Sequence, residues 1–161
     1  MSVRSPPLIC IVGPSGSGKT TLIEKIIDSL LAKGYSAGTI KHHIHDDFEI
    51  DHEGKDTWRH AQAGAETVCI SSPTMFAMVK RVKKELNLDE ISSYQEDRDV
   101  ILADGFNRSD RPRVIIAREE ADLINFGEGK EVLATIKDTL DPRQVGCIVD
   151  AIEALIKSDS K

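Results

Sequence analysis

The fold of this chain is decided by Leu8-Ile-Cys-Ile-Val12 and the eight residues that follow, Gly13-Pro-Ser-Gly-Ser-Gly-Lys-Thr20. The apolar run predicts a buried strand, and the glycine-rich run has the Walker A spacing of Gly, four residues and Gly-Lys-Thr. Glycines lack a Cβ, so successive backbone N–H groups can turn toward phosphate oxygens, and a helix beginning near Gly18 adds its positive end. Strand, loop and helix together predict a nucleoside triphosphate site.

The side chains of this loop have expected roles in that site. Lys19 is expected to reach the β- and γ-phosphates, and the Thr20 hydroxyl to ligate the Mg²⁺ that bridges them. The predicted nucleotide-binding residues are Gly13, Pro14, Ser15, Gly16, Ser17, Gly18, Lys19, Thr20, Thr21 and, at the end of the next strand, Lys41.

Length and composition narrow the class of protein. The 161 residues suit a single domain, 1–161, with 1–7 and 158–161 as frayed tails. A net charge of −6 without a long Lys/Arg run disfavours nucleic acid as a partner. Three dispersed cysteines predict buried thiols in the reducing cytoplasm, and no segment approaches the length of a membrane span.

Apolar periodicity and turn residues predict the remaining elements. Helices are expected from Gly18 to Gly34, over 55–63, over 87–95 and from a capping box at Asp141-Pro-Arg-Gln144 onward. Strands are expected over 35–41, 65–71, 75–79, 99–104, 113–117 and 130–136. This alternation predicts an α/β fold of the P-loop NTPase type. Its twisted sheet is mostly parallel, with helices on both faces and an antiparallel hairpin at one edge.

A carboxylate ends one of the apolar strands. In Asp99-Val-Ile-Leu-Ala-Asp-Gly-Phe106, the strand runs into Asp104. This is the form of a Walker B element, so we expect Asp104 to hold Mg²⁺ together with Thr20.

The segment 42–54 is too polar for a core and too long for an ordinary connection, which favours a switch or substrate lid. Within it, Asp47 or Asp51 is a candidate to orient water, and His42 or Lys41 to meet a phosphate; Lys19, Asp51 and His42 are the catalytic candidates. A transition-metal site is an alternative for the cluster His42, His43, His45 and Asp46, although its spacing matches no zinc pattern.

The residues leave the base undecided. Guanine is commonly read by an Asn-Lys-x-Asp loop, and the nearest candidate is Thr135-Ile-Lys-Asp138. Its lysine and aspartate are adjacent, so the spacing differs from that motif.

Five blocks of the chain resemble the molybdopterin-guanine dinucleotide biosynthesis protein B family, MobB. They are Gly13-Pro-Ser-Gly-Ser-Gly-Lys-Thr-Thr-Leu22, Ile40-Lys-His-His-Ile-His-Asp-Asp-Phe-Glu-Ile-Asp51, Gly54-Lys-Asp-Thr-Trp-Arg-His60, Ala63-Gly-Ala65 and Asp104-Gly-Phe106. Gly13, Gly18, Lys19 and Thr20 match the family's phosphate loop, and Lys41, His42, Asp47, Asp51, Asp56, Arg59 and His60 match its middle block. At Asp104 the family usually has glutamate, which is one methylene longer.

The resemblance implies a GTP-binding protein with weak GTPase activity and with GTP and Mg²⁺ as cofactors. Such a protein assists the attachment of GMP to molybdopterin during molybdenum cofactor biosynthesis. It also implies a homodimer that works with the guanylyltransferase MobA. Two other classes remain open from the residues: a nucleotide-gated metal-delivery GTPase of the nickel-insertase kind, and a small-molecule P-loop kinase.

Overall fold

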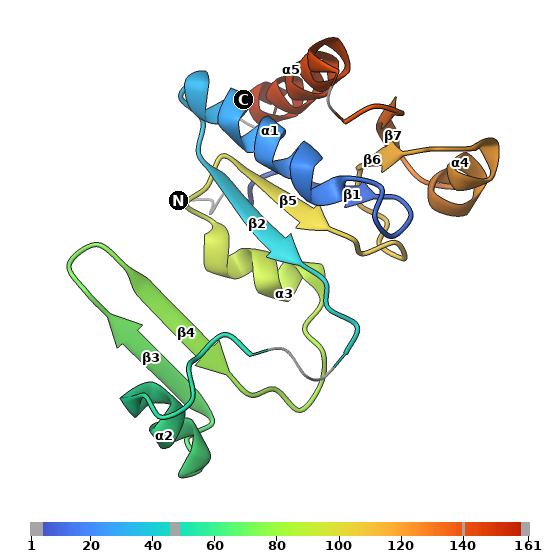
Figure 1. The fold of residues 1–161 in the computed structure, drawn as a ribbon. Helices are drawn as coiled ribbons and strands as arrows, with labels where there is room; N and C mark the ends of the chain where they lie inside the picture. The colour runs from blue at the N-terminus through green and yellow to red at the C-terminus, as the bar shows by residue number, and fades with distance from the viewer. Residues whose placement is uncertain (1–4, 46–48, 140, 159–161) are drawn as a thin grey trace. The chain divides into compact units, whose positions relative to one another are not determined.

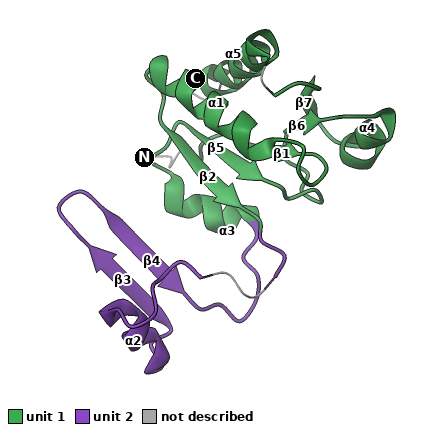
Figure 2. Ribbon diagram, in the orientation of Figure 1, with its two compact units in different colours: residues 1–42, 88–161 green, residues 43–87 purple. Residues whose placement is uncertain are grey.

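The computed structural model describes residues 5–45, 49–139 and 141–158, and the chain divides into two compact units (Figures 1 and 2). The larger unit comprises residues 1–42 and 88–161, and the smaller one residues 43–87. Along the chain, the smaller unit lies between two strands that are neighbours in the sheet of the larger unit. The single domain expected from the sequence stays a prediction.

The larger unit is built on a five-stranded sheet in which every pairing is parallel. Its strands are β1 (Leu8–Val12), β2 (Ala37–Lys41), β5 (Val100–Asp104), β6 (Arg113–Ile116) and β7 (Val132–Ile136), in the order β2-β5-β1-β6-β7. The predicted strands and their parallel arrangement are confirmed. All five carboxyl ends therefore meet at one edge, where open α/β sheets bind ligands.

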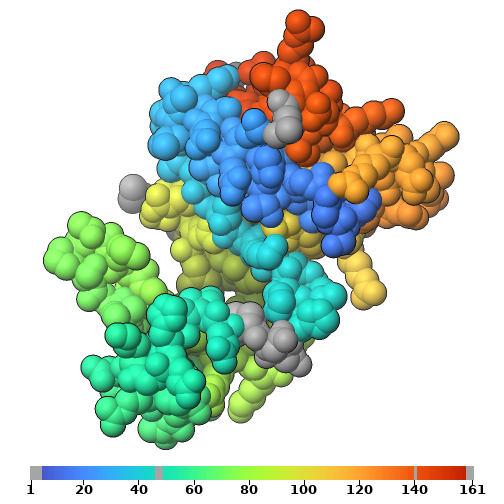
Figure 3. Space-filling view, viewed as in Figure 1, coloured from blue at the N-terminus to red at the C-terminus, as the bar shows by residue number. Residues whose placement is uncertain are grey.

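Helices cover both faces of this sheet, as predicted (Figure 1). Along β1 successive side chains alternate between the faces. Ile9 and Ile11 pack in the core with α1 (Lys19–Ala32) and α5 (Pro142–Ser158), whereas Leu8, Cys10 and Val12 pack with Leu88 of α3 (Leu88–Ser92). In the space-filling view α1, in blue, and α5, in orange-red, lie against each other (Figure 3).

Helix α1 follows the predicted apolar spacing. Leu22, Ile23, Ile26 and Leu30 are buried, and Gly34 adopts a φ of 85° immediately after the C-cap residue, as expected for a C′ glycine.

Helix α4 (Glu120–Gly127) was not predicted. Its capping box uses Glu119 as N-cap and Asp122 at N3, whereas the usual signature has Ser, Thr, Asp or Asn at the cap and Glu or Gln three residues later. The short helix therefore carries no strong start signal in the sequence.

The smaller unit contains a helix and a hairpin. They are α2 (Asp56–Gln62), β3 (Thr67–Ser71) and β4 (Phe76–Lys80). The strands pair antiparallel, so the predicted hairpin is confirmed, but they form a separate two-stranded sheet rather than the edge of the large one. No residue of these three elements is buried.

Two predicted chain features differ in detail. Pro6 is buried and Pro7 O accepts a hydrogen bond from Ile101 N at 2.9 Å, so the tail predicted over 1–7 is ordered from at least Pro6; residues 1–4 and 159–161 lie outside the described residues.

Asp141 caps α5 through Arg143 N at 2.9 Å. Gln144 does not complete a capping box, because its Oε1 accepts from Lys137 N and its Nε2 donates to the Asp141 carboxylate.

The predicted helix over 87–95 forms as α3 followed by a 3₁₀ turn, η1 (Ser93–Gln95). Among the helices that the structure describes, none combines the length and apolar character needed to cross a lipid bilayer.

Candidate functional site

Residues 13–20, here called the glycine loop, connect β1 to α1 at the carboxyl edge of the sheet. Gly13 has a φ of 154°, and a Cβ there would lie 2.7 Å from Ile116 O and 3.0 Å from Ser17 Oγ. Only glycine fits this position. The loop is thereby held close to the end of β6.

The start of α1 offers donors without acceptors. Gly18, in the left-handed region with a φ of 94°, is the N-cap residue, and no side chain caps the helix. The first-turn N–H groups of a helix have no partner within the helix. The buried Ser17 Oγ also lacks a hydrogen-bond partner in the described part of the chain. Unpaired donors at a positive helix end fit an anion such as a phosphate.

Lys19 folds back over the glycine loop. Its Nζ donates to Gly13 O at 2.9 Å and to Pro14 O at 2.8 Å. The ammonium therefore lies at the loop where the sequence placed phosphate oxygens. The positive charge that an anion would need is therefore already positioned at the loop.

A second cation lies beside the predicted metal ligand. Lys41 and Asp104 are register partners at the ends of β2 and β5, and Lys41 Nζ is 2.7 Å from Asp104 Oδ2. The side chain of Asp104 is 13% exposed and that of Lys41 is 70% exposed. A carboxylate with so little solvent favours a bound cation, so Asp104 fits the role of a Mg²⁺ ligand. Thr20, in the first turn of α1, is exposed.

Backbone contacts fix the position of Asp104. His42 N donates to Asp104 O at 3.0 Å, and Gly105 N donates to Ile11 O at 3.0 Å. The His42 ring lies 4.7 Å from the Phe106 ring between centroids. His42 thus belongs to the same edge of the sheet as Asp104.

Asp51 belongs to the smaller unit. Its Oδ1 accepts a hydrogen bond from His52 N at 2.8 Å. Asp47 lies outside the described residues. Their roles in orienting water stay predictions.

The histidine-rich segment forms no metal cluster in the described ranges, where no group of three or more His, Cys, Asp or Glu side chains could hold a metal ion. The rings of His43 and His45 lie edge to face, 5.6 Å apart, and Asp46 is outside the described residues. The transition-metal alternative, which includes Asp46, stays untested.

Two residues at the glycine loop were missed from the sequence. The Arg118 guanidinium donates to Gly16 O, and Thr139 Oγ1 would lie 2.9 Å from a Cβ on Gly18. Arg118 and Thr139 follow β6 and β7 closely. Each residue follows a strand that ends at the same edge of the sheet as β1, and this position was the available sequence signal. Without the strand order, however, that signal could not show that they lie at the glycine loop.

A buried arginine supports the segment that follows Asp104. Arg113 is fully buried, and its guanidinium donates to Asn107 O at 3.1 Å and to Phe126 O at 2.8 Å, as well as to Ser109 O. It ties this segment to the end of α4. The sequence had identified Arg113 only as a strand residue.

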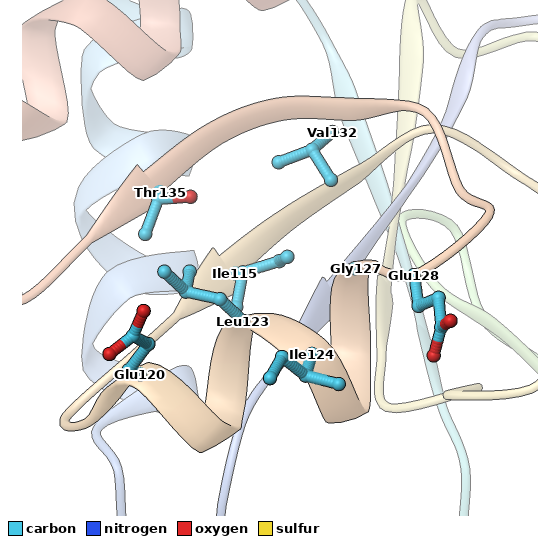
Figure 4. Close-up of a pocket in the computed structure, with 8 residues that line it drawn as sticks. All are labelled: Ile115, Glu120, Leu123, Ile124, Gly127, Glu128, Val132 and Thr135. Atoms are coloured by element: carbon cyan, nitrogen blue, oxygen red, sulfur yellow. The ribbon is translucent and has the colours of Figure 1, made fainter.

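A hollow of about 570 Å³ lies between α4 and strands β6 and β7 (Figure 4). Its lining is mainly apolar and includes Ile115, Leu123, Ile124 and Val132, with Glu120 and Glu128 also lining it. None of its lining residues belongs to the glycine loop. The hollow is therefore distinct from the predicted phosphate site.

A parallel sheet in this strand order, with helices on both faces and a glycine loop between β1 and α1, is consistent with the class of P-loop NTPases. Within that class the comparisons are specific. Residues 8–138 match the family model for molybdopterin guanine dinucleotide synthesis protein B. The chain belongs to this family, MobB, and the resemblance found in its sequence is confirmed.

Relatives in two bacteria carry the name molybdopterin-guanine dinucleotide biosynthesis adapter protein. The chain is 38% identical over 117 residues to the one from Haemophilus influenzae, which covers 71% of this chain and 65% of that protein. It is 34% identical over 119 residues to the one from Escherichia coli, with 71% and 67% covered. The match thus spans about two thirds of these relatives' length.

Solved structures of the family share the fold. A crystal structure of molybdopterin-guanine biosynthesis protein B superposes with a TM-score of 0.74 at 26% identity, covering 93% of this chain and 99% of the other. Bacillus subtilis MobB superposes with a TM-score of 0.69 at 27% identity, covering 90% and 97%.

Proposed function

We propose that this chain binds Mg²⁺·GTP at the glycine loop and acts as an adapter in the attachment of GMP to molybdopterin. The observation that carries the proposal is the glycine loop itself, which leaves α1 uncapped and holds the Lys19 ammonium. Membership of the MobB family supports the pathway. The names of the relatives support the adapter role.

The phosphates would be held by residues 13–21. Backbone N–H groups of the glycine loop and the start of α1 supply directed donors, and Lys19 supplies a positive charge. Moving Lys19 from the carbonyls of Gly13 and Pro14 to a phosphate exchanges two neutral acceptors for a charged one. Charge-assisted hydrogen bonds are the stronger kind, so this exchange favours the bound state.

The metal would be held by Thr20 and Asp104. Mg²⁺ prefers oxygen ligands and commonly takes only one or two from the protein, with phosphates and water completing its shell. Bound Mg²⁺ would neutralise charge on the β- and γ-phosphates. The ion pair between Lys41 and Asp104 would break when Asp104 binds the metal, and Lys41 would remain close to the phosphates.

Hydrolysis by the chain alone is expected to be slow. The sequence shows no water-orienting glutamine at the loop, and an arginine finger supplied by a partner is worth a factor of about 10³–10⁵ in rate. Asp51 and His42 are the proposed residues for orienting water and for contacting the γ-phosphate. Single-turnover GTP hydrolysis by wild type, Asp51→Asn and His42→Ala tests them. Unchanged rates in both variants would remove these residues from the chemistry.

The proposed partners are the guanylyltransferase MobA, molybdopterin and a second copy of this chain. The smaller unit exposes several large apolar side chains on or beside its hairpin, namely Ile70, Met75, Phe76, Met78, Val79 and Val82. A two-stranded sheet is marginally stable in water, so coverage by a second copy is a reasonable expectation. Sedimentation equilibrium of wild type and Phe76→Ser/Met78→Ser tests it, and a monomeric wild type would contradict it.

The adapter role is tested by reconstitution. Guanylyltransferase, molybdopterin and Mg²⁺·GTP are incubated with wild type, Lys19→Ala or Lys25→Ala, and formation of the guanine dinucleotide is followed. Lys25 lies on α1 outside the glycine loop and is the matched control. We expect stimulation by wild type and Lys25→Ala but not by Lys19→Ala. Equal stimulation by all three would contradict a role for bound nucleotide.

A further inference from the structure

Two segments border the glycine loop on the side away from Asp104. Segment 117–119 follows β6 and reaches the loop through the hydrogen bond from Arg118 to Gly16 O. Segment 137–139 follows β7 and places Thr139 against Gly18. Asp104 ends β5, which lies on the opposite side of β1 in the strand order. The glycine loop therefore has a carboxylate side and an Arg118/Thr139 side.

The two different sides of the glycine loop predict how a bound nucleotide is oriented. This inference rests on the proposed function. A metal ion held by Thr20 and Asp104 would neutralise charge on the terminal phosphates, so the γ-phosphate would lie on the carboxylate side. The α-phosphate, ribose and base would then extend toward segments 117–119 and 137–139, and these segments would surround the nucleoside.

Both segments are held by side chains outside them. Asp122 is buried, and its Oδ2 accepts from Arg118 N at 2.8 Å and from Glu119 N at 3.2 Å. Gln144 Oε1 accepts from Lys137 N at 3.1 Å. A binding surface that is fixed before the ligand arrives loses less entropy on binding.

The two segments offer two carboxylates for reading a base. The Glu119 side chain accepts from the backbone of α4 in the capping box. Asp138 is an exposed residue next to Thr139. A carboxylate only accepts hydrogen bonds. Guanine presents two donors side by side, N1–H and the 2-amino group, whereas adenine presents an acceptor at N1.

We propose that Asp138 selects guanine by accepting hydrogen bonds from N1–H and the 2-amino group. Arg118 is a positioning residue that holds the glycine loop through Gly16 O and forms the wall opposite segment 137–139. The adjacent Lys137 and Asp138 do not reproduce the Asn-Lys-x-Asp spacing. The sequence alone therefore could not assign this role, and the strand order supplies it.

Binding of the Mg²⁺ complexes of GTP, XTP and ATP to wild type, Asp138→Asn, Asp138→Ala and Arg118→Met tests the assignment. Xanthine has a carbonyl in place of the 2-amino group, so an asparagine amide pairs with it. We expect Asp138→Ala to lose about 10- to 100-fold in GTP affinity with little change for ATP, as for hydrogen bonds to a charged group. Asp138→Asn is expected to prefer XTP to GTP. Arg118→Met is expected to weaken all three nucleotides alike.

Folding of each variant is monitored by circular dichroism and thermal unfolding. If wild type prefers GTP and both Asp138 variants keep the same GTP-to-ATP ratio, the assignment is overturned while the proposed function stands. If wild type binds none of the nucleotides, both are overturned. A folded Asp138→Asn variant that gains XTP affinity and loses GTP affinity supports the assignment.

Discussion

Lys41 Nζ lies 2.7 Å from Asp104 Oδ2, across the carboxyl ends of the neighbouring strands β2 and β5. The Lys41 ammonium is therefore paired with one oxygen of the carboxylate that we propose as the metal ligand. Mg²⁺ has to compete with this ammonium for Asp104. Because Lys41 is largely exposed, its attraction is modest.

Replacing this lysine is expected to make the metal easier to bind. Lys41→Met should lower the Mg²⁺ concentration that half-saturates GTP binding by about two- to five-fold, since an exposed ion pair is worth up to about 1 kcal/mol. Lys41→Arg, which keeps the charge, is the matched control. Fluorescence titration with Mg²⁺ measures the effect at a labelled GTP concentration that saturates each variant, because Lys41 is also proposed to lie at the phosphates and its loss weakens GTP binding. A higher Mg²⁺ requirement in Lys41→Met would refute the competition.

The close approach of Gly13 to β6 should make that position intolerant of a side chain. Gly13→Ala is expected to lower the free energy of unfolding by about 2–3 kcal/mol, because its Cβ would meet the Ile116 carbonyl oxygen. At Gly16 a Cβ meets nothing within 4 Å. Gly16→Ala should cost only about 1 kcal/mol, from its positive φ. Urea unfolding of both variants checks the difference, and equal costs would contradict it.

How far the sequence could lead is clearest at the glycine loop. The order of strand, loop and helix around Gly13 and Lys19 depends on residues close in the chain, so spacing alone predicted it. Asp104 was predicted because an apolar run ends at it. Local pattern was sufficient for both.

Other features depend on contacts between distant parts of the chain. The pairing of β3 with β4 was predicted, but not their separation from the large sheet, because no local pattern records which strand lacks further partners. Arg118 and Thr139 reach the glycine loop only because β6 and β7 follow β1 in the sheet. Periodicity contains no information on strand order.

The cysteines differ in reactivity for a reason that the sequence did not show. All three are free, and only Cys10 is buried, whereas Cys69 and Cys147 are exposed; the prediction of buried thiols was correct for one of them. Burial raises the pKa of the Cys10 thiol above its usual value of 9.0, which keeps it protonated and unreactive.

Alkylation should therefore separate these thiols. In the folded protein near neutral pH, iodoacetamide is expected to modify Cys69 and Cys147, and Cys10 only after denaturation. Mass spectrometry of tryptic peptides identifies the modified residues. Rapid modification of Cys10 in the native protein would show that β1 is more accessible than the structure indicates.

An acidic residue joins the two helices on one face of the sheet. Hydrogen bonds from Lys157 and Lys33 lower the pKa of Glu153 from 4.5 to about 2. Because the folded pKa lies below the unfolded one, the stabilisation is complete above about pH 4.5 and is lost as the pH falls through about 2. Glu153→Gln should lower the melting temperature at neutral pH.

That decrease should shrink as the pH is lowered toward 2. Melting temperatures of wild type and Glu153→Gln across this range measure it. Asp150→Asn, which removes the other carboxylate paired with Lys33, is the comparison variant. A pH-independent difference for Glu153→Gln would mean that its effect is one of packing rather than charge.

The most direct test of nucleotide binding is calorimetric titration of Mg²⁺·GTP into wild type, Lys19→Ala and Lys25→Ala. We expect wild type and Lys25→Ala to bind alike, and Lys19→Ala to bind at least about ten-fold more weakly, from the loss of charge-assisted hydrogen bonds to phosphate. Circular dichroism confirms that the variants are folded. Equal affinities for wild type and a folded Lys19→Ala variant, or no binding by wild type, would contradict a phosphate site at the glycine loop.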